Sequence, residues 1–228
     1  MIKDREPQIE IIFFLWGSIF LGYRMYVVHR EQRLLEFDFV RVAPGEKILP
    51  SGALERVADL RAALAQRPAW ENRILPGCIL VALQRFHATG SVSEASSAVK
   101  DRAERTADEL DSSLSLVRFI VWAIPAIGFV GTARGIGDAL TFADTAVKGN
   151  ISAVTSWLGL AFNSTLVGLL LCIPLMYVVH VVQSTQEATI LDIQAYCCDH
   201  VIDAMKLPAP AGDSGHDRER WGRPGGFE

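Results

Sequence analysis

Long apolar runs dominate the hydrophobic pattern of this chain. Two of them, Phe119–Ala139 and Trp157–Val182, are each long enough to cross a bilayer as a helix, because a hydrocarbon core of about 30 Å needs roughly 20 apolar residues. A third run, Ile11–Val28, is interrupted near its end by Arg24, and a long arginine can snorkel to the interface there. The pattern predicts an all-α polytopic membrane protein with three transmembrane helices.

The first run has a competing interpretation as a signal peptide. No small-residue cleavage site follows Leu21, and the charges before the run are mixed, which favours an uncleaved first helix.

Orientation follows from the basic residues: twelve Lys and Arg lie between His29 and Ser115, whereas 143–156 contains only Lys148. The positive-inside rule therefore predicts that the large loop and the C-terminus are cytoplasmic and that the N-terminus is outside.

The segments outside the spans read as helical. Ser51 is a candidate cap for a helix through Arg67, and Gly77–His87 is a second apolar helix that ends at Gly90. The sequence of Ser91–Glu94 matches a capping box, so the second span is predicted to continue a helix that begins near Val92. The third span should likewise extend to Ala204–Lys206.

These signals give a predicted organisation along the chain. Its parts are an external N-terminus (1–10), the first transmembrane helix (11–28), a cytoplasmic helical region (29–115), the second transmembrane helix (116–142), an external loop (143–156), the third transmembrane helix (157–182), a cytoplasmic helix extension (183–206) and a disordered, Gly/Pro/charge-rich tail (207–228).

Composition excludes several function classes. Half of the 228 residues are hydrophobic and the net charge is −4 without a basic stripe, which argues against nucleic-acid binding. The four cysteines have no CxxC spacing and the five histidines are scattered, so we expect no metal and no cofactor. No Walker A, GxSxG or HExxH sequence occurs, and Gly135-Ile-Gly137 lacks the last glycine of GxGxxG. The chain is therefore not expected to be an enzyme.

Small residues gather on one face of the second and of the third span. A projection at about 100° per residue places on these faces Pro125, Gly128, Thr132, Gly135 and Ala139 of the second span, and Ala161, Thr165, Gly168 and Cys172 of the third, with Ser164 on the flank. Small residues let helices approach closely. Helix packing alone is the simpler explanation, and membrane threonines often bond to their own helix.

The matched hydroxyl groups nevertheless favour an ion pathway. Thr132, Thr165 and Ser164 would be uncharged oxygen groups able to contact a hydrated ion or a protonatable carboxylate. No acidic residue occurs on either small-residue face, so a carboxylate that carries protons there would have to come from another chain.

Three polar residues lie off these faces. Arg134 points almost directly away and stands at i,i+4 to Asp138, a spacing that suits an ion pair, a subunit contact or a partner contact. Asn163 lies roughly opposite Thr165 and is expected to make an interhelical hydrogen bond or a contact with another subunit or the partner.

The paired motifs resemble those of the MotA/TolQ/ExbB proton channel family. They are Ile124-Pro-Ala-Ile-Gly-Phe-Val-Gly-Thr-Ala-Arg-Gly-Ile-Gly137, then Leu160-Ala-Phe-Asn-Ser-Thr-Leu-Val-Gly168 and Ile173-Pro174. The three-span topology with a cytoplasmic loop is most similar to the ExbB/TolQ branch. Two departures stand out: Arg134 replaces a tryptophan common in that branch, and Leu160 replaces a glutamate at the start of the third span.

The resemblance implies a homopentamer in the bacterial inner membrane. It would surround a dimer of a single-span ExbD/TolR/MotB-like partner whose membrane aspartate carries the ion, with Thr132 and Thr165 matching the family's threonines. The expected function is a proton- or sodium-conducting channel subunit of a gradient-driven motor. The alternative is a non-conducting membrane scaffold that assembles a partner complex. Lipid is the expected surrounding, and no nucleic acid is expected to bind.

Overall fold

The computed structural model describes residues 5–37, 39, 47–67, 70 and 73–205. The described part is helical, as the sequence predicts. Its elements are α1 (Arg5–Leu35), α2 (Ala53–Ala65), α4 (Ile74–Thr89), α5 (Val92–Ser113), α6 (Ser115–Leu140), α7 (Ala143–Val147), α8 (Ser152–Tyr196), the π-helix η1 (Cys197–Ile202) and α9 (Asp203–Met205). The predicted tail, 207–228, lies outside the described residues.

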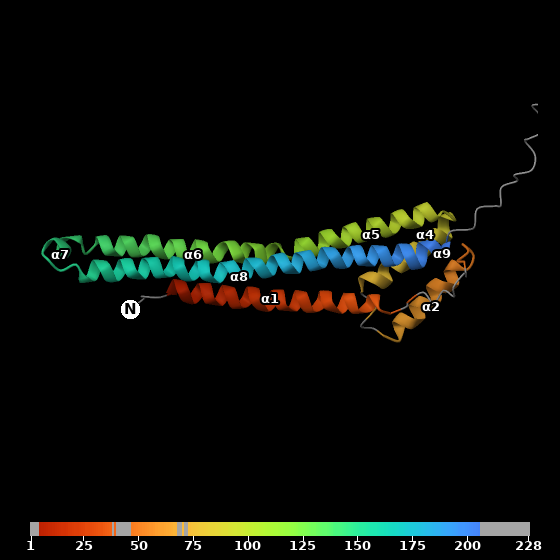
Figure 1. The fold of residues 1–228 in the computed structure, drawn as a ribbon, viewed down its shortest axis with the longest axis horizontal. Helices are drawn as coiled ribbons and strands as arrows, with labels where there is room; N and C mark the ends of the chain where they lie inside the picture. The colour runs from red at the N-terminus through yellow and green to blue at the C-terminus, as the bar shows by residue number, and fades with distance from the viewer. Residues whose placement is uncertain (1–4, 38, 40–46, 68–69, 71–72, 206–228) are drawn as a thin grey trace, which may run out of the picture.

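Three helical stretches are long and apolar enough to cross a membrane: Arg5–Leu35, Val92–Leu140 and Ser152–Met205. The helices α6 and α8 run antiparallel and side by side, joined at one end through α7, and α1 packs along both (Figure 1). The contact between the three helices buries a cluster that includes Leu21, Ile124 and Leu175. Most other large apolar side chains of these helices point outward, as lipid-facing side chains do.

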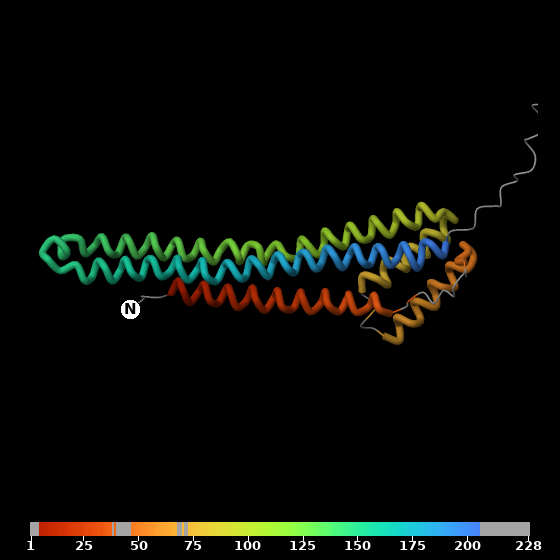
Figure 2. The backbone as a smooth tube through the Cα atoms, viewed as in Figure 1, coloured from red at the N-terminus to blue at the C-terminus, as the bar shows by residue number. Residues whose placement is uncertain are grey.

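The opposite end of the bundle is a compact group of helices that we call the head lobe. It consists of α2, α4, the beginning of α5, η1 and α9, and it surrounds a core that includes Leu75, Ile79, Phe86 and Ile193. The helix α8 continues from the apolar bundle into this lobe, so it runs along almost the whole molecule (Figure 2). This confirms that the third helix extends beyond its apolar span.

Local sequence signals explain several helix ends. Gly90 ends α4 in the left-handed conformation, with φ 64°, and its N–H bonds to the Phe86 carbonyl. The Ser91 hydroxyl then accepts from the Glu94 N–H and caps α5, as the capping box predicts. The prediction for Ser51 was wrong, because Gly52 occupies the N-cap of α2 and makes no side-chain cap bond.

The second span is not one unbroken helix with α5. A single residue, Leu114, separates α5 from α6, and its side chain is fully buried. The Ser113 hydroxyl donates to the Leu110 carbonyl at this point, and such side-chain bonds compete with the helical backbone pattern. Arg118 of α6 bonds back to Asp111 of α5 across the break, so the two helices remain nearly continuous.

Candidate functional site

The two predicted threonines meet at the contact between α6 and α8. The Thr132 hydroxyl lies 2.9 Å from the Ala161 carbonyl oxygen of α8 and 3.2 Å from the Gly128 carbonyl oxygen of its own helix. The Thr165 hydroxyl lies 3.1 Å from the same Gly128 oxygen, and the two hydroxyls are hydrogen-bonded to each other. The pair therefore joins the two apolar helices, and does more than bond each threonine to its own helix.

This hydroxyl pair can change its hydrogen bonds. Each threonine hydroxyl has one proton and two acceptor lone pairs, whereas the Thr132 oxygen alone has three neighbours within bonding distance. The two protons can therefore be distributed over the contacts in more than one way. Such a group can accept a hydrogen bond from a passing ion's water or from a protonated carboxyl without carrying a charge.

The small residues make this close contact sterically feasible. A Cβ atom added at Gly128 would lie 3.1 Å from the Thr165 Cα, and one added at Gly135 would lie 2.7 Å from the Ala161 Cβ. Both positions are buried, as are the Ala139 and Gly168 positions. Glycine is needed at positions 128 and 135 because any side chain there would push α6 and α8 apart.

Proline at position 125 takes part in the same helix contact. Because Pro125 has no N–H, the carbonyl of residue i−4, Val121, has no partner in its own helix. The Cys172 thiol of α8 donates to that carbonyl at 3.3 Å. The helix α6 thus continues through the proline while α8 satisfies the released oxygen.

A buried carboxylic side chain lies at the same contact, and it comes from the first helix. Glu10 of α1 is 0% exposed. Its Oε1 lies 3.0 Å from the position that a Cβ of Gly128 would take, and its Cδ lies 3.4 Å from that of Gly168. The first helix thus adds a buried carboxyl group of this chain to the contact of α6 and α8, whose own small-residue faces contain none, and an ion-carrying carboxylate from another chain stays a prediction.

The sequence does contain a signal for Glu10. The buried residues of α1 include Glu10, Gly17, Leu21 and Val28, spaced by seven, four and seven, which is the pattern of one helix face. The apolar run begins at Ile11, directly after Glu10. The helix itself begins earlier, at Arg5. Extending the helical projection of the first span by one turn would have placed Glu10 on its inner face.

The predicted contact residue Arg134 pairs with the first helix. Its guanidinium lies 2.6 Å from the Glu6 carboxylate of α1, and the Glu6 side chain is only 14% exposed. The i,i+4 spacing to Asp138 does not reveal this partner, because Glu6 belongs to another helix. Asp138 is half-buried near the end of α6 and Asn163 is exposed on α8, so a role for either in subunit or partner contacts stays a prediction.

Ser164 lies between these groups. It is 5% exposed, and its hydroxyl has no hydrogen-bond partner among the residues that the structure describes. It lines a small cavity of about 20 Å³, together with Glu6, Gly131 and Arg134 among others. A cavity of this size has room for about one water molecule, since about 10–15 Å³ suffices.

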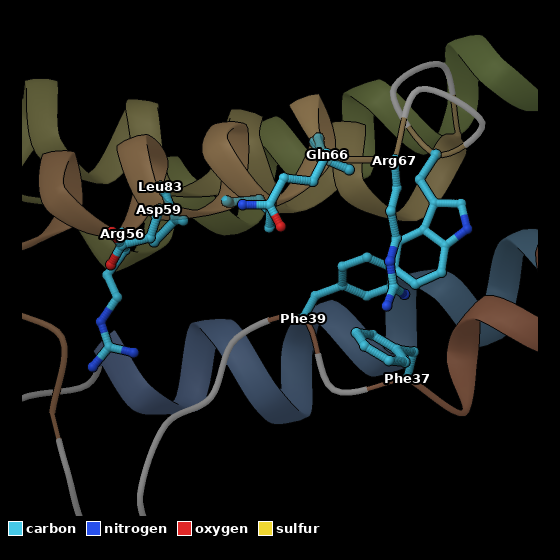
Figure 3. Close-up of a pocket in the computed structure, with 11 residues that line it drawn as sticks. Phe37, Phe39, Arg56, Asp59, Gln66, Arg67 and Leu83 are labelled. Carbon is cyan, nitrogen blue, oxygen red and sulfur yellow. The ribbon is translucent and has the colours of Figure 1, made fainter.

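Larger cavities occur toward the opposite end of α1. One of about 420 Å³ in the head lobe is shown in Figure 3, where Arg67 lies beside Phe37 and Phe39. The Arg67 guanidinium also lies 4.3 Å from the centre of the Trp70 ring. Another, of about 510 Å³, lies where α1, α4, α5 and α8 meet and is lined by Arg24, Glu31 and Gln186 among others.

Cysteines and metal sites add little to this picture. All four cysteines are free. Cys197 is buried in the head lobe, where its hydrogen bond with Cys78 and its burial raise the pKa of the Cys197 thiol well above its usual range. Such a thiol is a poor nucleophile. Within the described residues, no group of three or more His, Cys, Asp or Glu side chains is placed to hold a metal ion.

The comparisons with known proteins identify the family. No curated protein and no solved structure matches the chain. The model of the MotA/TolQ/ExbB proton channel family matches residues 71–195, which include both threonines but not Glu10. This match does not distinguish the ExbB/TolQ branch. Because it covers more than half of the 228 residues, the chain belongs to the MotA/TolQ/ExbB proton channel family.

Proposed function

We propose that this chain is the ion-conducting subunit of a gradient-driven membrane motor, with protons or sodium ions as the transported species. The observation that carries the proposal is the hydroxyl pair of Thr132 and Thr165, which share the Gly128 carbonyl at the contact of two apolar helices. Polar groups at the inner contacts of membrane helices are rare and often mark an ion pathway. The family membership supplies the function class.

The assembly that we propose is a homopentamer around two copies of a one-span partner. The partner supplies a membrane aspartate, and the chain supplies hydroxyls that exchange hydrogen bonds as this aspartate is protonated and released. One charge that crosses the membrane provides about 2.3 kcal/mol per 100 mV. That energy can bias a swing or rotation of the partner.

The proposed placement is the bacterial inner membrane, with the head lobe and the C-terminus in the cytoplasm and the N-terminus outside. The support for this orientation is the excess of Lys and Arg between His29 and Ser115. A scaffold that assembles a partner without conducting ions would use the same small-residue contacts and is the competing function.

The test separates conduction from assembly. Thr132→Val and Thr165→Val keep the shape of the side chain but remove its oxygen, so the pentamer and its partner complex should remain largely intact. Loss of a hydrogen bond of about 1.4 kcal/mol lowers a rate by about tenfold. We expect each variant to reduce ion flux by about that factor in vesicles that contain the co-purified partner.

The matched control is Thr155→Val. The Thr155 hydroxyl bonds to the Ile151 and Ser152 carbonyls of its own chain near the beginning of α8, so its removal should leave flux unchanged. Wild-type flux in the Thr132→Val/Thr165→Val double variant, with assembly verified in the same preparation, would favour the scaffold over the channel.

A further inference from the structure

Glu10 combines complete burial with a lack of hydrogen bonds. It is 0% exposed, and neither carboxylate oxygen has a hydrogen-bond partner among the described residues. Burying an ionised carboxylate without a partner destabilises a fold far more than burying the neutral acid does. A side chain that destabilises an apolar bundle in this way points to a role beyond packing.

The surrounding helices make room for this carboxyl group. The Glu10 Oε1 lies 3.0 Å from a Cβ position on Gly128 of α6 and 3.4 Å from one on Gly168 of α8. An alanine at Gly128 would also meet the Ser164 carbonyl at 3.1 Å. Two glycines on different helices therefore leave space where the carboxyl group lies, and this arrangement is more specific than a stripe of small residues.

Among the described residues, Glu10 has no ion-pair partner. On α1, Glu6 lies one turn earlier and Arg5 directly before Glu6. On α6, Arg134 is bonded to Glu6 at 2.6 Å, and Arg118 lies near the other end of the helix, bonded to Asp111. Along α8, residues 152–171 contain no Asp, Glu, Lys, Arg or His. The hydroxyls of Ser164 and Thr165 are its polar side chains near this contact, and neither titrates near neutral pH.

A small cavity lies one turn from Glu10, beside Glu6 of the same helix. The cavity of about 20 Å³ that Ser164 lines also contacts Glu6 and Arg134, at the N-terminal end of α1. The Ser164 hydroxyl has no described partner, so it is able to bond to a water molecule in the cavity. Gly128 contacts both groups, because the Glu10 Oε1 lies 3.0 Å from its Cβ position and its carbonyl bonds to Thr132 and Thr165.

From this geometry we infer that Glu10 is a reversible proton-binding residue within the chain, located where Gly128 of α6 and Gly168 of α8 leave space for its carboxyl group. One proton binds to one carboxylate oxygen and leaves again to water, and no other bond forms or breaks. The residue is neutral at rest. Its use in ion transport rests on the proposed function, but its protonation does not.

The experiment reads the protonation state directly. The full chain with its partner in lipid vesicles is studied by infrared difference spectroscopy, with wild type compared with Glu10→Gln at neutral pH. The expected difference is the loss of a carboxylic-acid C=O band. The matched control is Glu31→Gln, because Glu31 is a buried glutamate of the same helix that is paired with Arg73 at 2.9 Å. Its difference spectrum should show carboxylate bands.

A second measurement uses the reactivity of the neutral acid. Dicyclohexylcarbodiimide forms a stable N-acylurea with protonated carboxyl groups in apolar surroundings, so mass spectrometry should locate the adduct on Glu10 and not on Glu6 or Glu31. Carboxylate bands for Glu10 in the infrared spectrum would overturn the inference. Neither readout measures flux, so normal flux in the threonine variants would contradict the proposed function and leave this result unaffected.

Discussion

The first helix buries one glutamate near its beginning and another near its end, in opposite surroundings. Glu31 accepts from the Arg73 guanidinium at 2.9 Å and from the Ile74 backbone N–H at 3.2 Å. Glu10 has no described hydrogen-bond partner. The two side chains lie roughly 31 Å apart along α1, as 21 residues at about 1.5 Å each, so one helix carries both a buried carboxylate with hydrogen bonds and one without.

The difference separates a stabilising side chain from a costly one. Glu31 bonds to the first N–H group of α4, where a negative charge also interacts favourably with the helix dipole. It therefore holds α1 against the head lobe. Glu10 makes no such bond within the described residues. Residues that destabilise a fold without a compensating contact are typical of functional sites.

The largest effect on stability is expected at the paired glutamate. Glu31→Leu leaves the mostly buried Arg73 without this carboxylate and the Ile74 N–H without its acceptor. Breaking a buried pair in this way costs about 3 kcal/mol or more. The midpoint of thermal unfolding in detergent should fall clearly, and an unchanged midpoint would mean that the pair does not hold α1 to the head lobe.

The next effect tests the close contact between α6 and α8. Gly135→Ala would place a Cβ 2.7 Å from the Ala161 Cβ and 3.2 Å from the Trp157 carbonyl oxygen, so α6 and α8 must separate at a cost of about 2 kcal/mol. Gly22→Ala is the control, since nothing lies within 4 Å of its added Cβ. Its helix should gain up to about 1 kcal/mol. Equal unfolding midpoints for the two variants would refute the close α6–α8 contact.

A smaller effect of opposite sign is expected at the unpaired glutamate. Glu10→Met replaces a buried polar group that lacks partners by an apolar side chain of similar length, which should stabilise the bundle by about 1 kcal/mol. The same thermal assay detects it as a raised midpoint. Destabilisation comparable to that of Glu31→Leu would show that Glu10 has a structural partner after all.

The smallest effect concerns Asp111, an exposed carboxylate that is paired with Arg118. Its hydrogen bonds with Arg118 lower the pKa of Asp111 below its usual range. The stabilisation is therefore present above the usual aspartate pKa and is lost as the pH falls through the lowered one. Because both side chains are more than a third exposed, solvent screening keeps it below about 1 kcal/mol.

Comparison with Asp111→Asn checks this expectation. The wild type should unfold at a slightly higher temperature than the variant at pH 7, and the gap should close at strongly acidic pH. A gap that persists in acid would assign the difference to something other than the charge of Asp111.

Sequence reasoning recovered the helices better than their contacts. The length and apolarity of the runs predicted three spanning helices, because a bilayer fixes that length. The small-residue faces predicted that Thr132 and Thr165 lie at one helix contact, because side-chain periodicity follows from helix geometry. The partners of Glu10 and Arg134 depend instead on how α1 packs against α6, which no spacing within a single helix reveals.

The central claim is that the unpartnered carboxyl of α1 serves ion transport. Proton flux through vesicles that contain the complex tests it most directly, in Glu10→Gln against Glu31→Gln with equal assembly in both. Glutamine keeps the size of glutamate but cannot exchange a proton, so flux through Glu10→Gln should fall on the order of a hundredfold. Flux through Glu31→Gln should stay near the wild-type level. Wild-type flux through Glu10→Gln would contradict the account.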